Sequence, residues 1–201
     1  MRENETATQS LSEHQGMALV SLARHTIMER LGGHPDPVQV QRIEEILQDS
    51  ALRVHSGTFV TLKLQGELRG CIGNLTAVDS IVQGVRENAV HAAFHDPRFQ
   101  PLAAQELEKV QIEVSVLTEP QQLAYDDVNE LLAKLKPGID GVILRKGSAS
   151  ATFLPQVWEQ LPRPESFLAH LCMKAGLGAK AWRKGNLNVY TYQVQYFEEP
   201  R

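Results

Sequence analysis

The sequence predicts an α+β fold with a mixed, largely antiparallel sheet of about six strands, flanking helices and a small second lobe. Short β-rich segments joined by Gly-containing turns predict the strands, and segments of helical period between them predict the helices. Of the 201 residues, 42% are hydrophobic, which is enough for one sizeable core. We therefore expect a disordered tail over residues 1–11 and a single domain over 12–198.

The first part of this domain is expected to be helical. Ser12 is a good N-cap for a helix with apolar residues at helical spacing, and Gly32-Gly33 ends that helix. A second, shorter helix follows Pro37. We expect residues 12–55 to form the helical part of the smaller lobe and residues 56–198 to form the main α/β lobe.

Strands and helices then alternate along the chain. Residue type and alternation predict strands at 59–64 and 68–72, joined as a hairpin, at 110–117, at 141–145 and 150–154, and at 188–197. Capping and helix-breaking residues predict helices at 80–94, 127–135, 155–160 and 164–176.

Composition excludes several classes of protein. The net charge is -4, so no basic excess favours nucleic acid as a partner. No apolar run approaches the roughly 20 residues that span a bilayer, and the polar N-terminus lacks the apolar core of a signal peptide. Two cysteines are too few for a disulfide scaffold. A soluble, cytoplasmic protein with reduced thiols is expected.

The most informative segment is Leu68-Arg69-Gly70-Cys71-Ile72-Gly73-Asn74, at the end of the predicted hairpin. Glycines on both sides of Cys71 permit positive φ or close approach of the backbone to another group. Arg69 and Cys71 share a face in an extended strand, and a nearby guanidinium favours a reactive thiolate. The alternative is that Cys71 is a small core residue between glycines that shape a bulge, and spacing alone favours this alternative.

A second cluster follows the helix that is predicted to end near residue 94. His91 and His95 are four residues apart, which suits two metal ligands, and a histidine there is also a candidate general base for Cys71. No third ligand lies nearby in the sequence, so no metal site is predicted. Asp96 and Arg98 are interpreted as a pair that locks the loop, or Arg98 as a clamp for a carboxylate or phosphate.

Further candidates lie on later strands. Glu113 and Ser115 share the strand face opposite the valines, which is either solvated or lines a cleft. Thr152 and Gln156 lie where a strand enters a turn, a common place for ligand contacts. Trp158 is expected in the core. A C-terminal basic cluster is either a solvated surface or a phosphate- or RNA-contacting patch; its members are Lys174, Lys180, Arg183 and Lys184.

Several blocks of this sequence resemble the AMMECR-domain family, whose bacterial members are known as AmmeMemoRadiSam system protein A. The resemblance spans residues 15 to 198, in order, and rests on LRGCIGN at 68–74, AAFHDPRFQPL at 92–102, IEVSVLTEP at 112–120, PGIDGVIL at 137–144, ATFLPQVWEQ at 151–160 and FLAHLCMKAGL at 167–177. It implies a two-lobed α+β fold with a cleft, no settled activity, and Memo-like and radical-SAM proteins as partners.

The resemblance also selects residues. Arg69, Gly70, Cys71 and Gly73 match the central motif, and Asn74 stands where a threonine is expected. His95 departs from the pattern, which weakens both the metal pair and a Cys71–His95 dyad. The other matches are Asp96, Arg98, Phe99, Glu113, Ser115, Thr152, Leu154 and Pro155.

The leading hypothesis is an enzyme or enzyme component that acts on a small anionic or nucleotide-like substrate, with no cofactor predicted. Cys71 would be the reactive thiol, Glu113 would orient groups or transfer protons, and Arg69 and Arg98 would hold the anion. The remaining candidate binding residues are Gly70, Gly73, Asn74, Asp96, Ser115, Thr152 and Gln156. The alternative is a binding or adaptor module without turnover, and a weaker alternative is RNA binding through the C-terminal basic cluster.

Overall fold

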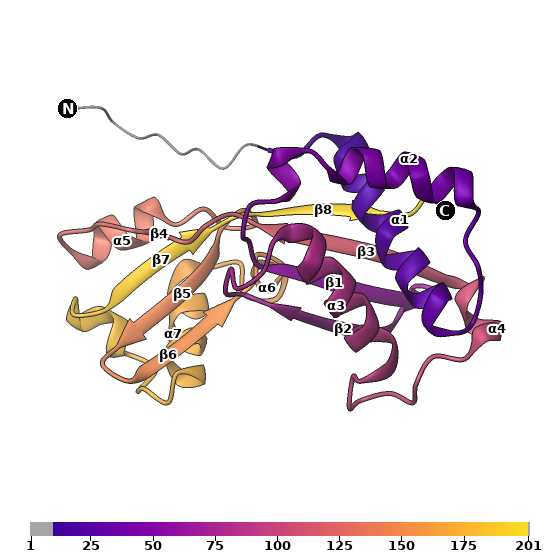
Figure 1. Ribbon diagram of the computed structural model, residues 1–201. Helices are drawn as coiled ribbons and strands as arrows, with labels where there is room; N and C mark the ends of the chain where they lie inside the picture. The colour runs from indigo at the N-terminus through magenta and orange to yellow at the C-terminus, as the bar shows by residue number, and fades with distance from the viewer. Residues whose placement is uncertain (1–9, 201) are drawn as a thin grey trace, which may run out of the picture. The chain divides into compact units, whose positions relative to one another are not determined.

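A computed structural model describes residues 10–200, which divide into two compact units. The first unit comprises the chain up to Leu117 together with the segment from Gln195 onward, and the second unit is Thr118–Val194. The chain therefore leaves the first unit once and returns to it once. Figure 1 shows the order of the elements along the chain.

The first unit is a four-stranded antiparallel sheet with helices on one face. Its strands lie in the order β2-β1-β3-β8. Its helical elements are α1 (Glu13–Arg30), α2 (Pro37–Leu47), the 3-10 helix η1 (Ser50–Leu52), α3 (Ile81–Phe94) and α4 (Ala104–Leu107). Its strands are β1 (Thr58–Leu64), β2 (Glu67–Asn74), β3 (Val110–Leu117) and β8 (Val194–Glu198).

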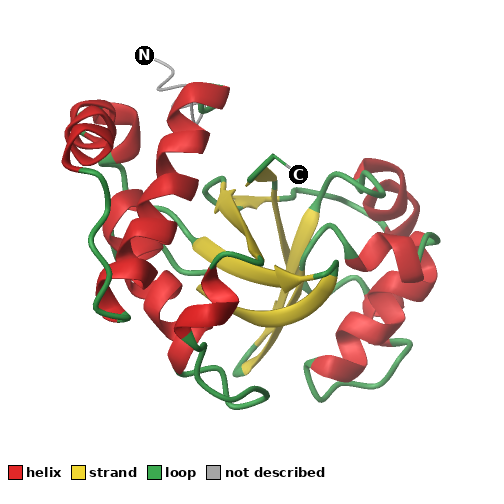
Figure 2. Ribbon diagram, turned by 90° about the vertical axis from the view of Figure 1, so that its right-hand side faces the viewer, coloured by secondary structure: helices red, strands yellow, loops and turns green. Residues whose placement is uncertain are grey.

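Local signals explain the helices of this unit. Ser12 caps α1 and forms a capping box with Gln15, and Ser80 caps α3 through the backbone N–H of Gln83. Both helices pack on the sheet, to its left in Figure 2. Their apolar stripes meet the inward-facing side chains of β1 and β3 in one core; fully buried members are Leu19, Ile27, Val60, Leu62, Val85, Ala89, Ile112 and Val114.

The β1–β2 hairpin has a tight turn and an irregular register. Gln65 and Gly66 form a two-residue loop with φ of +54° and +86°, which matches a type I′ turn. Leu64 pairs with Glu67 and Lys63 with Leu68, but Leu62 pairs with Gly70 because the register shifts at a bulge. Arg69 is the extra residue, and Cys71 comes to lie opposite Thr61.

Replacing Gln65 with asparagine is expected to raise the free energy of unfolding by about 0.5–1 kcal/mol. A long side chain is disfavoured at positive φ, whereas Asn followed by Gly is preferred in this turn. Urea denaturation of Gln65→Asn beside the parent protein measures the difference. Gln65→Val should lower stability, since a β-branched residue fits this conformation poorly; equal stabilities of all three proteins would contradict the prediction.

The second unit is a second four-stranded sheet, in the order β4-β7-β5-β6, with its own helices. Trp158 is buried, stacks on Phe167 at 3.7 Å between ring centroids and donates its Nε1–H to the carbonyl of Asp140, so its expected core role is confirmed. The elements are β4 (Gln121–Gln122), α5 (Val128–Lys134), β5 (Gly141–Lys146), β6 (Ala149–Phe153), α6 (Val157–Gln160), α7 (Pro164–Lys174), the 3-10 helix η2 (Ala181–Lys184) and β7 (Asn188–Tyr192).

The α+β class is confirmed, but the strands of residues 10–200 form two sheets rather than one. The single strand expected at 188–197 is two strands, β7 and β8, which belong to different sheets. They are separated at Gln193, whose N–H donates to the Thr118 hydroxyl and whose carbonyl accepts the Thr118 N–H, each at 2.8 Å. Alternation alone predicted one strand because it continues through this break.

The expected boundaries also need correction. Residues 12–55 do not form a separate lobe from the hairpin, because α1 and the partly buried apolar side of α2 share one core with β1 and β3. The tail expected over 1–11 lies outside the described residues up to residue 9. Leu11 is buried and donates its N–H to the Gln195 side chain.

None of the helices within residues 10–200 combines the length and apolar character needed to cross a lipid bilayer.

Candidate functional site

One face of the first unit's sheet is covered by α1 and α3, and the opposite face carries Cys71. Side chains alternate between faces along a strand, so the residues between the core positions of β1, β2 and β3 share this second face. We call it the thiol face and define it by Phe59, Thr61, Lys63, Cys71, Gly73, Glu113 and Ser115.

Cys71 lies at the middle of the thiol face. The Thr61 hydroxyl donates to the Cys71 sulfur, with 3.3 Å between Oγ1 and Sγ. Because the backbone N–H and carbonyl of Cys71 both bond away from β1, Thr61 and Cys71 form the close, non-hydrogen-bonded type of antiparallel pair. Both cysteines are free; Cys71 is half-buried, whereas Cys172 is fully buried and its pKa is raised by that burial.

Asp96 connects the loop after α3 to the outer edge of β2. Its carboxylate is buried and accepts the Cys71 N–H at 2.9 Å and the Arg98 N–H at 3.1 Å. It also accepts Nε and Nη2 of Arg98 at 2.9 and 2.7 Å, and Nη2 donates in addition to the Cys71 carbonyl at 3.1 Å. The expected loop-locking pair is confirmed, and it holds Cys71 from both backbone groups.

These donors set the charge of the pair. Hydrogen bonds from the Arg98 guanidinium, and then those from the two backbone N–H groups, hold the pKa of the Asp96 carboxyl far below its ordinary range despite its burial. The Arg98 side chain remains 53% exposed. Asp96 is therefore ionised at neutral pH, and Arg98 is held by one side while its other side is accessible.

Arg69 pairs with a different carboxylate from Arg98, that of Glu106. Its Nε and Nη2 donate to the two oxygens of Glu106 at 2.9 and 3.0 Å, which lowers the pKa of that carboxyl. Glu106 also accepts the Ala103 N–H. The Phe99 ring lies 5.9 Å from the Arg69 guanidinium and 5.5 Å from that of Arg98. Within the described residues, Nη1 of Arg69 is buried without a hydrogen-bond partner.

Glu113 is paired across the sheet. It lies opposite Thr61 on β3 and accepts from Lys63 at 2.9 Å, while Lys63 also donates to Glu198 at 2.8 Å. Burial opposes the charge on Lys63, but the hydrogen bonds to Glu113 and Glu198 outweigh burial and raise its pKa. Ser115 is buried and pairs with Phe59. Glu113, Thr61 and Cys71 thus form one cross-strand row.

The glycines beside Cys71 allow close approach rather than positive φ. A Cβ on Gly70 would lie 2.2 Å from the carbonyl oxygen of Ala92 in α3. A Cβ on Gly73 would lie 2.3 Å from the Phe59 ring and 2.4 Å from the Thr58 carbonyl oxygen. Asn74, the last residue of β2, is exposed.

The other predicted residues lie elsewhere. His91 and His95 are exposed near the C-terminal end of α3, with ring centroids 5.4 Å apart. Thr152 belongs to the second unit, where its hydroxyl bonds to Tyr192 and its carbonyl accepts from Lys174. Gln156, also in that unit, is exposed just before α6.

Three partners of the candidate residues were not predicted from the sequence: Thr61, Lys63 and Glu106. Alternation along 59–64 was a sufficient signal for Thr61 and Lys63, because it places them on the face away from the core. Glu106 had no such signal, since its pairing with Arg69 depends on the loop between α3 and α4.

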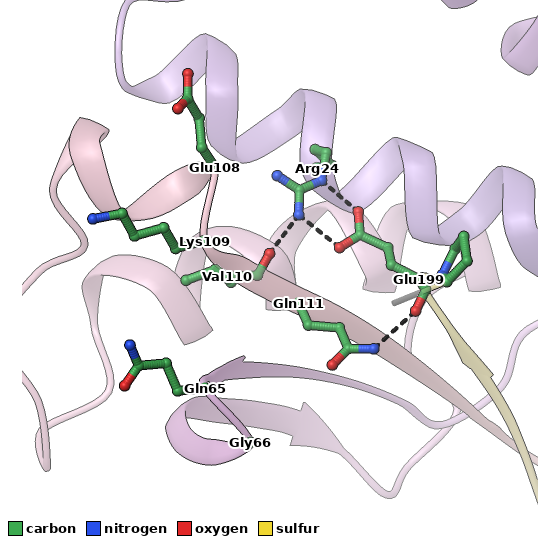
Figure 3. Close-up of a pocket in the computed structure, with 9 residues that line it drawn as sticks. Arg24, Gln65, Gly66, Glu108, Lys109, Val110, Gln111 and Glu199 are labelled. Atoms are coloured by element: carbon green, nitrogen blue, oxygen red, sulfur yellow. Dashed lines mark hydrogen bonds and ion pairs between the residues drawn. The ribbon is translucent and has the colours of Figure 1, made fainter.

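A separate hollow of about 740 Å³ lies in the first unit, away from the predicted residues (Figure 3). Arg24 of α1 reaches Glu199 there with two hydrogen bonds and donates to the Leu107 and Val110 carbonyls. Glu199 also accepts the Ile112 N–H at 2.9 Å. These contacts attach the C-terminal segment to α1 and β3.

The fold and the site define a class of protein with two α+β units, the first of which carries a thiol on the second strand of a hairpin. The chain belongs to the AMMECR1 family, whose model matches residues 20–197.

Relatives and a solved structure agree with this assignment. A protein of Thermofilum pendens is 40% identical over 94% of this chain and 92% of its own length. A protein of Methanothermobacter thermautotrophicus is 38% identical over 94% of this chain and 96% of its own length. The crystal structure of an uncharacterised protein from Pyrococcus horikoshii is similar with a TM-score of 0.74 and 34% identity, covering 94% of this chain and 93% of that chain.

Proposed function

We propose that the protein is a thiol-dependent enzyme or enzyme component that acts on a small anionic substrate, with Cys71 as the nucleophile. One observation carries the proposal. The buried Asp96 carboxylate binds both the Cys71 backbone N–H and the Arg98 guanidinium, so a half-buried thiol and a partly exposed cation are held by the same group. A nucleophile beside a fixed cation is suited to anionic substrates.

Each residue has a distinct part in this proposal. The free side of the Arg98 guanidinium binds the anion, because its Nε and Nη2 are already held by Asp96. The Thr61 hydroxyl stabilises negative charge on the sulfur by donating to it. Asp96 is a positioning residue. Glu113, in the same cross-strand row, is the candidate for proton transfer.

Arg69 does not have the role that the sequence-based hypothesis gave it, which was to hold the anion together with Arg98. Its guanidinium faces Glu106 in a two-point interaction and its remaining Nη1 is buried. We therefore assign substrate binding to Arg98 and a supporting role to Arg69, which holds the loop that carries Phe99.

Alkylation with one charged and one uncharged reagent tests the proposal. Iodoacetate is an anion and iodoacetamide is neutral, and both react with thiolates. We expect the iodoacetate-to-iodoacetamide rate ratio of Cys71 to exceed that of free cysteine by about three- to tenfold at low salt, because Arg98 attracts the carboxylate. Arg98→Gln should return the ratio to that of free cysteine, and added salt should reduce it.

Two controls make this test specific. Cys71→Ser should take up no label in the folded protein, since Cys172 is fully buried. Arg42→Gln removes an exposed arginine on α2 and should leave the ratio unchanged. A ratio equal to that of free cysteine in the parent protein would reject the anion site, and a Cys71 that resists both reagents would reject the nucleophile.

A further inference from the structure

We infer that the substrate carries a planar ring beside its anionic group, and that Phe59 on the thiol face selects for this ring. The inference rests on the proposed function, since it describes the other end of a ligand whose anion binds Arg98 and whose reacting atom meets Cys71.

The position of Phe59 follows from the register of the sheet. On β1 it lies directly opposite Gly73 of β2 and Ser115 of β3, on the same face as Thr61 and Cys71. Its neighbours across both strands are thus small. The Phe59 ring leans over Gly73, because a Cβ on that glycine would lie 2.3 Å from two of the ring's atoms.

This arrangement places an aromatic ring beside the polar row of Glu113, Thr61 and Cys71. Gly73 gives the ring a place against the backbone of β2, and Phe59 stays half-buried instead of joining the core of the first unit. Its other neighbours on this face are hydroxyl, thiol and charged groups at Thr61, Cys71 and Glu113. The ring therefore offers an apolar contact surface on the same face as the thiol, at the position diagonal to Cys71.

The distances between strand positions set the reach of the ligand. Diagonal neighbours across an antiparallel pair are about 7–8 Å apart, within reach of an aromatic side chain, and Phe59 is diagonal to Cys71. Arg98 contacts Cys71 from the opposite direction, through the outer edge of β2. Cys71 therefore has a cation at its outer backbone edge and an aromatic ring at the diagonal position on its face, which suits a ring-bearing anion better than a short aliphatic one.

Three alkylating agents separate these contributions. Iodoacetamide is neutral, iodoacetate is an aliphatic anion, and 4-(bromomethyl)benzoate is an anion with a ring. In each reaction the sulfur–carbon bond forms, the carbon–halogen bond breaks, the halide leaves with its electron pair and the thiol proton passes to solvent.

Phe59→Leu keeps an apolar side chain but removes the ring. We expect it to slow Cys71 alkylation by 4-(bromomethyl)benzoate about three- to tenfold, the range of one aromatic contact, and to leave both other rates within about twofold. Phe59→Tyr retains the ring and should keep the parental rate. Equal slowing of all three reagents, or no slowing of any, would overturn the inference.

A measurement on the parent protein avoids any folding defect of the variants. Benzoate should protect Cys71 from iodoacetamide at lower concentrations than acetate does, and equal protection would overturn the inference. Arg98→Gln separates the two proposals. If it lowers both anion rates while Phe59→Leu has no selective effect, the anion site stands and the ring selectivity fails; if it changes neither anion rate, the proposed function itself fails.

Discussion

Gly70→Ala is expected to lower the free energy of unfolding by about 3 kcal/mol. A Cβ at this position would lie 2.2 Å from the Ala92 carbonyl oxygen, far inside van der Waals contact. That oxygen belongs to the backbone of α3, so no side-chain rotation relieves the clash, and α3 or β2 must shift in a close-packed core. Urea denaturation monitored by circular dichroism measures the loss.

Gly178→Ala is the matched control for this experiment. Gly178 lies outside the positive-φ region and has nothing within 4 Å of an added Cβ, so its replacement should change stability by less than about 0.5 kcal/mol. Gly70→Ala should also change the alkylation rate of Cys71, because the shifted strand carries the thiol. A Gly70→Ala protein as stable as the control would show that α3 and β2 do not pack as described.

Asp96→Asn is expected to lower the free energy of unfolding by about 2–4 kcal/mol at pH 7. The amide has nearly the same shape as the carboxylate, but one of its two oxygen positions becomes an NH₂ donor that faces other donors. At least one of the donors on Cys71 and Arg98 thus loses its acceptor. The substitution also removes the negative charge that holds Arg98. Chemical denaturation gives the stability loss, and alkylation with iodoacetate shows whether Cys71 and Arg98 separate.

The same residue predicts how stability depends on pH. The folded-state pKa of Asp96 is depressed, whereas in the unfolded chain it is near the ordinary value of about 4. Its contribution is fully present above the unfolded pKa and is lost as pH falls below about 4 towards the folded pKa. The parent protein should therefore lose stability in this acid range more steeply than Asp96→Asn.

Asp126→Asn provides the control, since Asp126 is exposed at the start of the segment before α5 and should keep both the stability and the acid response of the parent. If Asp96→Asn and the parent lose stability in parallel as the pH falls below about 4, Asp96 is not the group responsible for the acid response.

Much of the fold was predictable because the relevant signals are local. Ser12 and Ser80 cap the helices that they were expected to cap, and the alternating residues of 110–117 form a strand with the valines buried. The division between two sheets was not predictable, because the alternation from 188 to 197 continues across Gln193 while its partner Thr118 is distant in sequence.

The placement of Cys71 shows where local signals end. A regular hairpin with a two-residue loop would place Gly70 opposite Thr61, which would turn Cys71 into the core. The bulge adds Arg69 to β2 and moves Cys71 to the other face. The choice between a core cysteine and an accessible one thus depended on a single extra residue, which the packing of Gly70 against α3 helps to fix.

The site residues were predictable by type but not by partner. Asp96 and Arg98 are two residues apart, so their pairing was accessible from the sequence, whereas their joint hold on Cys71 depends on how α3 packs against β2. The pairing of Arg69 with Glu106 bridges 37 positions and needs the intervening helix to turn the chain back.

The contact of Asp96 and Arg98 with Cys71 has one more consequence, for the behaviour of the protein at high concentration. β2 ends its sheet, and an exposed strand edge is a template for pairing with another chain. At Cys71 the carboxylate takes the outward N–H and the guanidinium covers the outward carbonyl, as a neighbouring strand would. At the β6 edge of the other sheet, Lys174 binds the Thr152 carbonyl. Side chains therefore occupy hydrogen-bonding groups at an edge of each sheet, where they oppose aggregation between molecules.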